Sequence, residues 1–506
     1  MTKAEKFTAL MTVDPEGRGL KARSVRATIW TSASSFCDFA TRIGSIAVLA
    51  RLISPEHFGL FMMVTAATAI VDQFRELGLS SATVQRATIT HEEVSNLFWL
   101  NVGISSVLAL LLVGAAPFIG DYYREPEAVG ITYALALNVF LAGLLVQHQA
   151  LLTRQLRMGN TAAIRLIASL VSTALAIVLA WSGWGYWALV WRELIRTIIL
   201  VIGVWVCLPW FPSRPNRKVD VRQMVAYGAN LTGANIFGSI AGAFDRFLLG
   251  RMWGAAPLAN YRQAHQVLSA PCDQLLSPIY QVAQPALSQL QSEPERYRRY
   301  FLRLVSLVAL ITMPLSLFTA VYAKEVTLVL LGEKWGNATL ALQILSIGTF
   351  IRQTVGCTSF ILLTLGRSKI YLILSIVGNA VSLIGICIGV QWGTTGVAIA
   401  DVAATYLMVF PRLRWNFKGS PVKVRDYLRT LVRPLVSTLA MTLGLLVLRP
   451  AMGAYLHSPF TSVALGSTVG LVIFATVWLI LPGGYTETRS MTNDLLSAVR
   501  KKRSKQ

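Results

Sequence analysis

The chain has 506 residues, of which 54% are hydrophobic and only 14% charged, a composition that excludes a soluble globular protein. Apolar runs of membrane-spanning length recur along it, which predicts an all-α, polytopic membrane protein. The formal net charge of +22 would suggest nucleic acid as the partner of a soluble chain. Here the basic residues gather in alternate loops, as the positive-inside rule requires, and the sequence therefore predicts no nucleic-acid partner.

Hydropathy predicts about 14 transmembrane helices. In chain order they cover about 26–50, 57–79, 96–118, 129–152, 161–182, 186–208, 225–250, 258–286, 301–323, 338–364, 370–390, 395–413, 430–449 and 460–482. An even number of spans puts both ends of the chain on one side. That side is predicted to be cytoplasmic, because most arginines and lysines follow the even-numbered helices, for example from Arg412 to Arg433. Residues 1–25 and the basic segment 483–506 would be cytoplasmic tails.

A weak internal repeat relates two parts of the sequence. RLISPEHFGLF at 51–61 and RMWGAAPLANY at 251–261 each begin with arginine, turn three residues later and place an aromatic residue ten positions on. Asp72 and Asp273 also correspond within one residue. The offset of about 200 residues equals six helices, which predicts two six-helix lobes related by a pseudo-twofold axis along the membrane normal. The N-terminal lobe would cover 26–208, the C-terminal lobe 225–415, and 428–482 would be an appended helix pair.

The eighth predicted helix is unusually polar for a membrane span. Polar residues, among them Arg262 and Asp273, recur at spacings of three, four or seven and so share one face. Pro271, Pro278 and Pro285 remove backbone hydrogen bonds at seven-residue intervals. Because hydrocarbon would leave these groups unsatisfied, the helix is predicted to face a wet interior and to line a transport path.

Ionisable residues inside the predicted spans form the candidate site. A charge at the bilayer centre costs at least about 2.5–3.5 kcal/mol, so these side chains must face water or one another. The candidates for binding an anionic head group are Arg42, Arg75, Arg192, Arg196, Arg262 and Arg352. The candidates for binding a coupling ion or for gating are Asp38, Asp72, Glu76, Asp245 and Asp273.

Interhelical ion pairs are the alternative role for these charges. That alternative is equally good for Asp38 with Arg42 and for the adjacent Asp245 and Arg246. Arg196 and Arg352 have no evident local partner, which favours anion binding. Guanidinium groups suit phosphate because they donate two parallel hydrogen bonds and keep their charge at every physiological pH.

The sequence carries no signature of catalysis or of a bound metal. The five cysteines form no metal-ligand spacing, and neither a phosphate-cradling glycine loop nor a nucleophile–base set is present. No predicted external loop exceeds roughly 15 residues, which counts against a membrane glycosyltransferase. We therefore expect a transporter without cofactors. A cation-coupled multidrug exporter is the main alternative and would need an acidic, aromatic cavity.

Seven segments carry a family resemblance. They are SPEHFGLF at 54–61, ELGLSSATVQR at 76–86, FWLN at 98–101, RQLRM at 154–158, DRFLLGRMWG at 245–254, ANYRQAHQ at 259–266 and QPALSQLQ at 284–291. They resemble the Wzx-type polysaccharide flippases of the multidrug/oligosaccharidyl-lipid/polysaccharide exporter superfamily. Within it, the similarity is to the branch that exports colanic-acid-like, succinoglycan-like and teichuronic-acid-like units.

The resemblance implies a flippase for undecaprenyl-pyrophosphate-linked oligosaccharide in a bacterial inner membrane, working by alternating access. The repeat units would serve the synthesis of exopolysaccharide, capsule or O-antigen. The implied partners are the lipid-linked oligosaccharide and membrane lipids, with a polysaccharide polymerase and co-polymerase as further ones. The residue pattern agrees, because a basic, amide-rich cavity suits a pyrophosphate-sugar head group.

Overall fold

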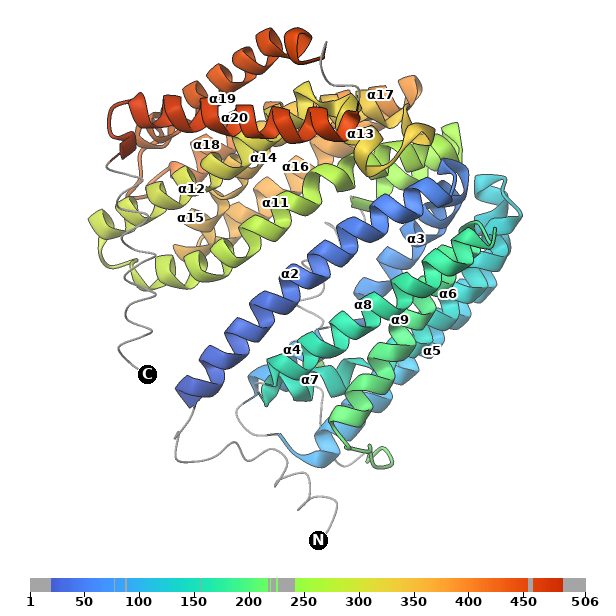
Figure 1. Cartoon of the computed structure of the whole chain (residues 1–506). Coiled ribbons are helices and arrows are strands. Elements are labelled where there is room, and N and C mark those ends of the chain that lie inside the picture. Colours follow the sequence, from blue (N-terminus) through green and yellow to red (C-terminus); the bar gives the residue numbers. More distant parts are fainter. Residues whose placement is uncertain are drawn as a thin grey trace. The chain divides into compact units, whose positions relative to one another are not determined.

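The computed structural model describes residues 20–485, with gaps at 77, 87–88, 156, 217–218, 220–223, 226–241 and 454–457. It describes side chains from Phe36 onward, except those at the helical positions 76, 85, 158 and 451–453. Within these ranges the chain is helical without strands, which confirms the predicted all-α fold (Figure 1). The predicted tails lie mostly outside the described residues. So does the predicted helix at 225–250, of which the final part is described as a helical segment at 242–253.

The first of two compact units ends at Asn260. Its helices are α2 (Leu20–Leu52), α3 (Pro55–Glu76), α4 (Leu79–Gln85), α5 (His91–Tyr123), α6 (Glu127–Gly143), α7 (Val146–Arg154), α8 (Met158–Trp181), α9 (Tyr186–Cys207) and the segment 242–253. Helix α5 packs against α6, α8 against α9, and α2 against α8. Long helices of this unit therefore lie side by side, as membrane spans do (Figure 1).

The second unit begins at Tyr261, inside α11 (Ala255–Gln289). It continues with α12 (Pro294–Val321), α13 (Ala323–Leu330), η1 (Glu333–Trp335), α14 (Ala338–Gly356), α15 (Ser359–Thr364), α16 (Ser368–Gly389), η2 (Val390–Trp392), α17 (Gly393–Leu407), α18 (Val409–Phe417), α19 (Val424–Gly453) and α20 (Pro459–Ile480). Each predicted span of this unit is present as a helix or as two helices in succession. The pseudo-twofold relation between two lobes stays a prediction.

Nine segments of the described chain are long and apolar enough to cross a membrane. One of them, 368–417, contains both α16 and α17 and is long enough to cross twice. Helices α2, α9 and α11 have 33, 22 and 35 residues and are also long enough, but they are absent from the nine because polar and charged residues interrupt them. These three helices carry several of the candidate site residues.

Three predicted spans are broken where continuous helices were expected, one of them at the single residue Met408 between α17 and α18. Leu144 and Leu145 separate α6 from α7, and Cys357 and Thr358 separate α14 from α15. At both places the chain keeps right-handed helical dihedral angles but forms shorter, three-residue hydrogen-bonded turns, such as Leu144 N to Leu141 O at 3.1 Å. A glycine ends the helix before each of these two breaks, Gly143 in α6 and Gly356 in α14, and polar residues lie close by.

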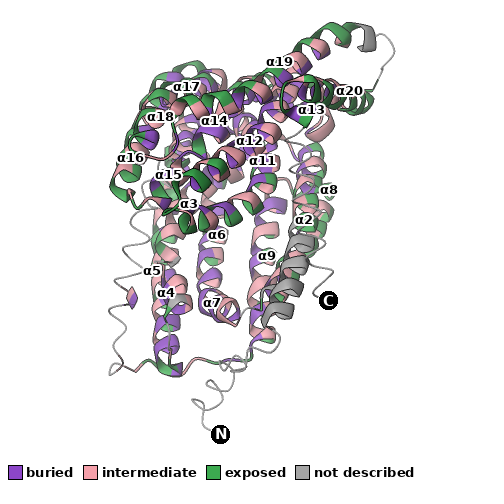
Figure 2. Ribbon diagram, turned by 90° about the vertical axis from the view of Figure 1, so that its left-hand side faces the viewer, coloured by how far each residue is buried: buried purple, intermediate pink, exposed green. Residues whose placement is uncertain are grey.

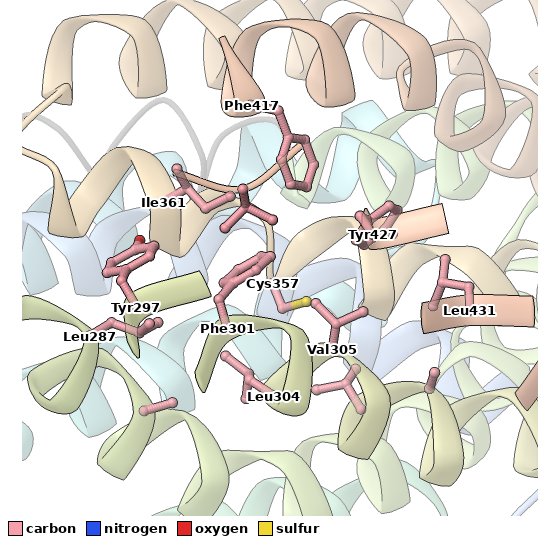
Figure 3. Close-up of a cluster of buried hydrophobic side chains, with 14 of the residues drawn as sticks. Leu287, Tyr297, Phe301, Leu304, Val305, Cys357, Ile361, Phe417, Tyr427 and Leu431 are labelled. Carbon is pink, nitrogen blue, oxygen red and sulfur yellow. The ribbon is translucent and has the colours of Figure 1, made fainter. Parts of the chain in front are cut away.

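A hydrophobic core in the second unit joins α11 and α12 to the later helices (Figure 3). Tyr297 and Phe301 of α12 are fully buried in it, and the Tyr297 hydroxyl lies 2.8 Å from Thr364 Oγ1. By contrast, the residues that α20 buries fall on one narrow stripe, Gly466, Gly470, Phe474 and Trp478. The remainder of α20 is apolar and mostly exposed (Figure 2), as expected of a surface that faces lipid.

The turn between α16 and α17 depends on glycines, which leads to a stability prediction. A Cβ atom at Gly396 would lie only 2.0 Å from the backbone oxygen of Gly389. We expect Gly396→Ala to lower the free energy of unfolding by about 2 kcal/mol, because the two helices must separate to admit the methyl group. Gly114→Ala in α5 is the control, since nothing lies within 4 Å of a Cβ there. Thermal melts of the purified variants would contradict the close approach if they gave equal melting temperatures.

Candidate functional site

In the first unit, charged side chains of α2 and α9 converge. The Arg192 Nη2 atom donates to Ser45 Oγ at 3.2 Å, and Arg192 Nε is buried without a hydrogen-bond partner among the described residues. Four further charges act on this guanidinium group, those of Asp38, Arg42, Glu193 and Arg196. The structure thus brings together four of the predicted site residues and adds Glu193. Three arginines face two carboxylates, which leaves one positive charge in excess.

The expectation that Arg196 has no local partner is wrong, and Arg352, which has no local partner, pairs with a residue of a distant helix. Arg196 Nη1 lies 3.5 Å from Glu193 Oε1 on the same helix, although both side chains are substantially exposed. The Arg352 guanidinium group is hydrogen-bonded to the Asp401 carboxylate and also donates to Thr405 Oγ1 at 3.0 Å. Asp401 lies on α17 and Arg352 on α14, so their pairing could not be read from local spacing.

The end of α3 opens onto a polar cavity of about 480 Å³. Arg75, whose Nε lies 3.1 Å from Asp72 Oδ1, contributes to its wall. The other lining residues come from α4, α7 and the break before α7, and they include Ser80, Ser81, Gln149 and Thr153. The Glu76 side chain lies outside the described residues. Hydroxyl and amide groups beside an arginine are suited to a sugar phosphate.

In the second unit, α11 continues through all three prolines and exposes its polar face. A cavity of about 300 Å³ is lined by Asp273, Leu276, Ser277, Tyr280, Gln281 and Gln284. Gln281 Nε2 donates to Ser277 Oγ at 3.2 Å, one helical turn away. The periodicity of the sequence therefore placed this face correctly, and Asp273 lies on it. Within the described ranges, His, Cys, Asp and Glu side chains nowhere gather in threes as metal ligands would.

A second group of charges surrounds His265 on α11. The charges of Arg262, Arg352 and Asp401 all act on its imidazole ring. Charged side chains from three helices, α11, α14 and α17, thus act on one imidazole ring. Asp245 is different, because its Oδ1 accepts a hydrogen bond from the Arg246 backbone N–H at 2.8 Å on the same helical segment. Its proposed gating role stays a prediction.

Three arginines outside the candidate site have clear structural roles. Arg154, from the RQLRM motif, donates Nη1 to the backbone oxygens of Thr83 at 3.0 Å and Val84 at 3.5 Å, and so satisfies carbonyl groups at the end of α4. Arg157 donates to Cys207 O, the last carbonyl of α9, at 3.4 Å. In the second unit, Arg367 donates in the same way to Gly419 O just after α18.

Comparisons with known proteins agree with this architecture. Residues 48–340 match the family described as "Polysaccharide biosynthesis protein". The lipopolysaccharide biosynthesis protein WzxC of Escherichia coli is 24% identical over 86% of this chain and 89% of its own. The succinoglycan biosynthesis transport protein ExoT of Rhizobium meliloti is 22% identical over 93% of this chain and 94% of its own. These matches confirm the resemblance that the sequence segments indicated.

Solved structures share the fold. The lipid II flippase MurJ, in an inward closed conformation, superposes with a TM-score of 0.73 at 12% identity, covering 89% of this chain and 98% of MurJ. An inward-facing multidrug resistance MATE family transporter of the MOP superfamily gives 0.61 at 17% identity, covering 75% and 93%. At these identities the likeness shows the fold alone. Because the family match extends over more than half of its residues, the chain belongs to the polysaccharide biosynthesis protein family.

Proposed function

We propose that this protein is a flippase that moves oligosaccharide repeat units linked to undecaprenyl pyrophosphate across the bacterial inner membrane. Its family membership and relatives named for lipopolysaccharide and succinoglycan biosynthesis support the proposal. The observation that carries it is the placement of shielded guanidinium groups inside a polytopic helical protein. Arg192 is enclosed between α2 and α9, and Arg352 is held between α14 and α17.

The charge balance favours an anionic substrate over a cationic drug. The charged group around Arg192 has three arginines and two carboxylates. A pyrophosphate head group would neutralise such an excess and accept paired hydrogen bonds from the guanidinium groups. A cation exporter needs the opposite excess, because its substrate must be attracted by carboxylates.

We further infer alternating access between lobes covering 26–208 and 225–415, with both termini in the cytoplasm. Parallel features in the two units support a repeat. Arg157 precedes α8 and Arg367 precedes α16, with φ, ψ angles of −81°, 47° and −92°, 49°. Arg157 donates to the last carbonyl of α9, and Arg367 donates to Gly419 O just after α18. A polymerase and a co-polymerase would receive the exported units.

Deletion of the protein tests the proposed function directly. The deletion strain should accumulate lipid-linked repeat units, measured by mass spectrometry of lipid extracts, and should lose extracellular polysaccharide. Expression of the wild-type chain should reverse both effects. Normal polysaccharide output without accumulation would contradict the proposal, and increased sensitivity to cationic drugs in that strain would favour the multidrug exporter instead.

Asp273 offers a test of ion coupling. If its carboxylate carries a coupling proton or cation, Asp273→Asn should slow transport at least about tenfold and remove its response to a proton gradient, because the amide cannot titrate. Transport would be followed in inverted vesicles by the protection of the sugar from an external glycosidase, with and without an ionophore. Gln284→Ala, on the same polar face, retains the carboxylate and should keep the gradient response. Gradient-dependent transport by Asp273→Asn would assign the carboxylate to packing.

A further inference from the structure

Arg412 of α18 is a cation that neither the candidate site nor the core uses. Its side chain is half-buried, and its guanidinium group lies against α16 where Gly378 leaves room for it. A Cβ atom at Gly378 would lie 3.1 Å from Arg412 Nη2, which is tighter than ordinary van der Waals contact. The position of the guanidinium group therefore depends on the absence of a side chain at Gly378.

The surroundings of Arg412 do not neutralise its charge. The charged and titratable groups that act on it are the Arg352 guanidinium, which is repulsive, and the Tyr371 phenol. In the part of the chain that the structure describes, neither a carboxylate nor any other acceptor is hydrogen-bonded to the Arg412 guanidinium group, and only its backbone N–H donates, to Met408 O at 3.1 Å. Asp401 is bound to Arg352, which also donates to Thr405. Two guanidinium groups therefore act on each other beside a single carboxylate, and the group lacks a negative charge.

The ordinary role of an arginine in this part of the sequence is to fix topology from the cytoplasmic side. Arg414, two residues further along α18, fits that role because it is exposed. Residues two positions apart point in different directions from a helix, so Arg412 cannot share the environment of Arg414. Partial burial beside a second arginine is unfavourable for a residue that only needs to remain in the cytoplasmic loop.

We propose that Arg412 and Arg352 bind a phosphate group, which supplies the missing negative charge. The inference rests on the proposed function and adds to it, because it assigns the phosphate of the carried lipid to α14 and α18 of the second unit. Two guanidinium groups can each donate a pair of hydrogen bonds to separate phosphate oxygens.

Binding of inorganic pyrophosphate to the purified protein in phosphatidylcholine nanodiscs tests the proposal. Pyrophosphate should raise the melting temperature of the wild type, because a ligand that binds only the folded state stabilises it. Arg412→Gln should weaken the apparent affinity at least tenfold, whereas Arg414→Gln, with the same change in net charge, should leave it unchanged. Arg412→Lys should be intermediate, since it keeps the charge but loses the paired donors. Equal affinities for the Arg412→Gln and Arg414→Gln variants would overturn the proposal.

Gly378 provides an independent test that leaves every charge in place. Gly378→Ala should displace the guanidinium group and weaken pyrophosphate binding several-fold. The matched control is Gly356→Ala at the end of α14, where nothing lies within 4 Å of a Cβ atom. If both alanine variants bind pyrophosphate as the wild type does, the guanidinium position against α16 has no part in binding and the proposal fails.

Two further measurements are needed. The first identifies which molecule supplies the phosphate, and the second tests the flippase proposal independently of phosphate binding. One outcome of the first is that phosphatidylglycerol in the nanodisc raises the melting temperature of the wild type but not of Arg412→Gln, with no further increase on addition of pyrophosphate. In that case the phosphate site is present and a bilayer lipid occupies it. If neither ligand stabilises the wild type, the site is absent. Polysaccharide export is measured separately, in the deletion strain complemented with the wild type. The flippase proposal can therefore fail while phosphate binding is confirmed, and phosphate binding can fail while the flippase proposal is confirmed.

Discussion

Arg352→Gln is expected to abolish polysaccharide export and to destabilise the second unit. The Arg352 and Asp401 side chains are only 30% and 18% exposed, so the substitution leaves a shielded carboxylate without its cation. Breaking a fully buried pair costs about 3–5 kcal/mol, and the partial exposure of this one reduces the expected loss to about 2 kcal/mol. Export would be measured in the complemented deletion strain, and stability by thermal melts in nanodiscs.

A second substitution separates the structural role of Arg352 from its role in binding. Arg352→Gln combined with Asp401→Asn removes both charges and should recover most of the lost stability, because two neutral amides can hydrogen-bond to each other and to Thr405. Export should remain absent, since the phosphate-binding charge is still missing. Recovery of export together with stability would show that Arg352 serves only to pair with Asp401.

The helices themselves were largely predictable because the signal for a membrane span is local. An apolar run of sufficient length must be helical in hydrocarbon, whatever the remainder of the chain does. The breaks before α7 and α15 were missed because hydropathy is averaged over a whole span, although Gly143 and Gly356 end the helix before each break.

The candidate site was predictable in its residue types but not in its pairings. Charged residues inside a membrane span are rare enough that Arg192 and Arg352 could be chosen as candidate site residues from their positions in apolar segments of the sequence. The partner of Arg352, however, is 49 residues away on another helix. Arg412 was assigned to a basic cytoplasmic loop because it begins a run of arginines and lysines. Its burial against Gly378 is a property of tertiary packing that no spacing reveals.

Arg192→Gln is expected to stop export, whereas Arg196→Gln should slow it only a few-fold. Arg192 is enclosed and bonded to Ser45 of α2, while the Arg196 side chain is 48% exposed. An exposed ion pair such as Arg196–Glu193 contributes at most about 1 kcal/mol, because water screens it. Because Arg196 is the more exposed of the two, we expect the larger effect from the substitution at Arg192. The sequence alone had favoured Arg196, for which it indicated no local partner. Export by the complemented deletion strain is the measurement.

Arg165→Gln, an exposed arginine on α8, controls for loss of positive charge in the same unit. Arg192→Lys separates charge from geometry: a lysine keeps the excess positive charge of the α2–α9 group but cannot present two parallel donors. We expect the Arg192→Lys protein to be present in the membrane at the wild-type level but to give less than a tenth of wild-type export. The reason is that the pyrophosphate must be bound in a fixed orientation as well as attracted. Full export by Arg192→Lys would mean that attraction suffices, and equal losses from Arg192→Gln and Arg196→Gln would mean that enclosure by α2 does not matter.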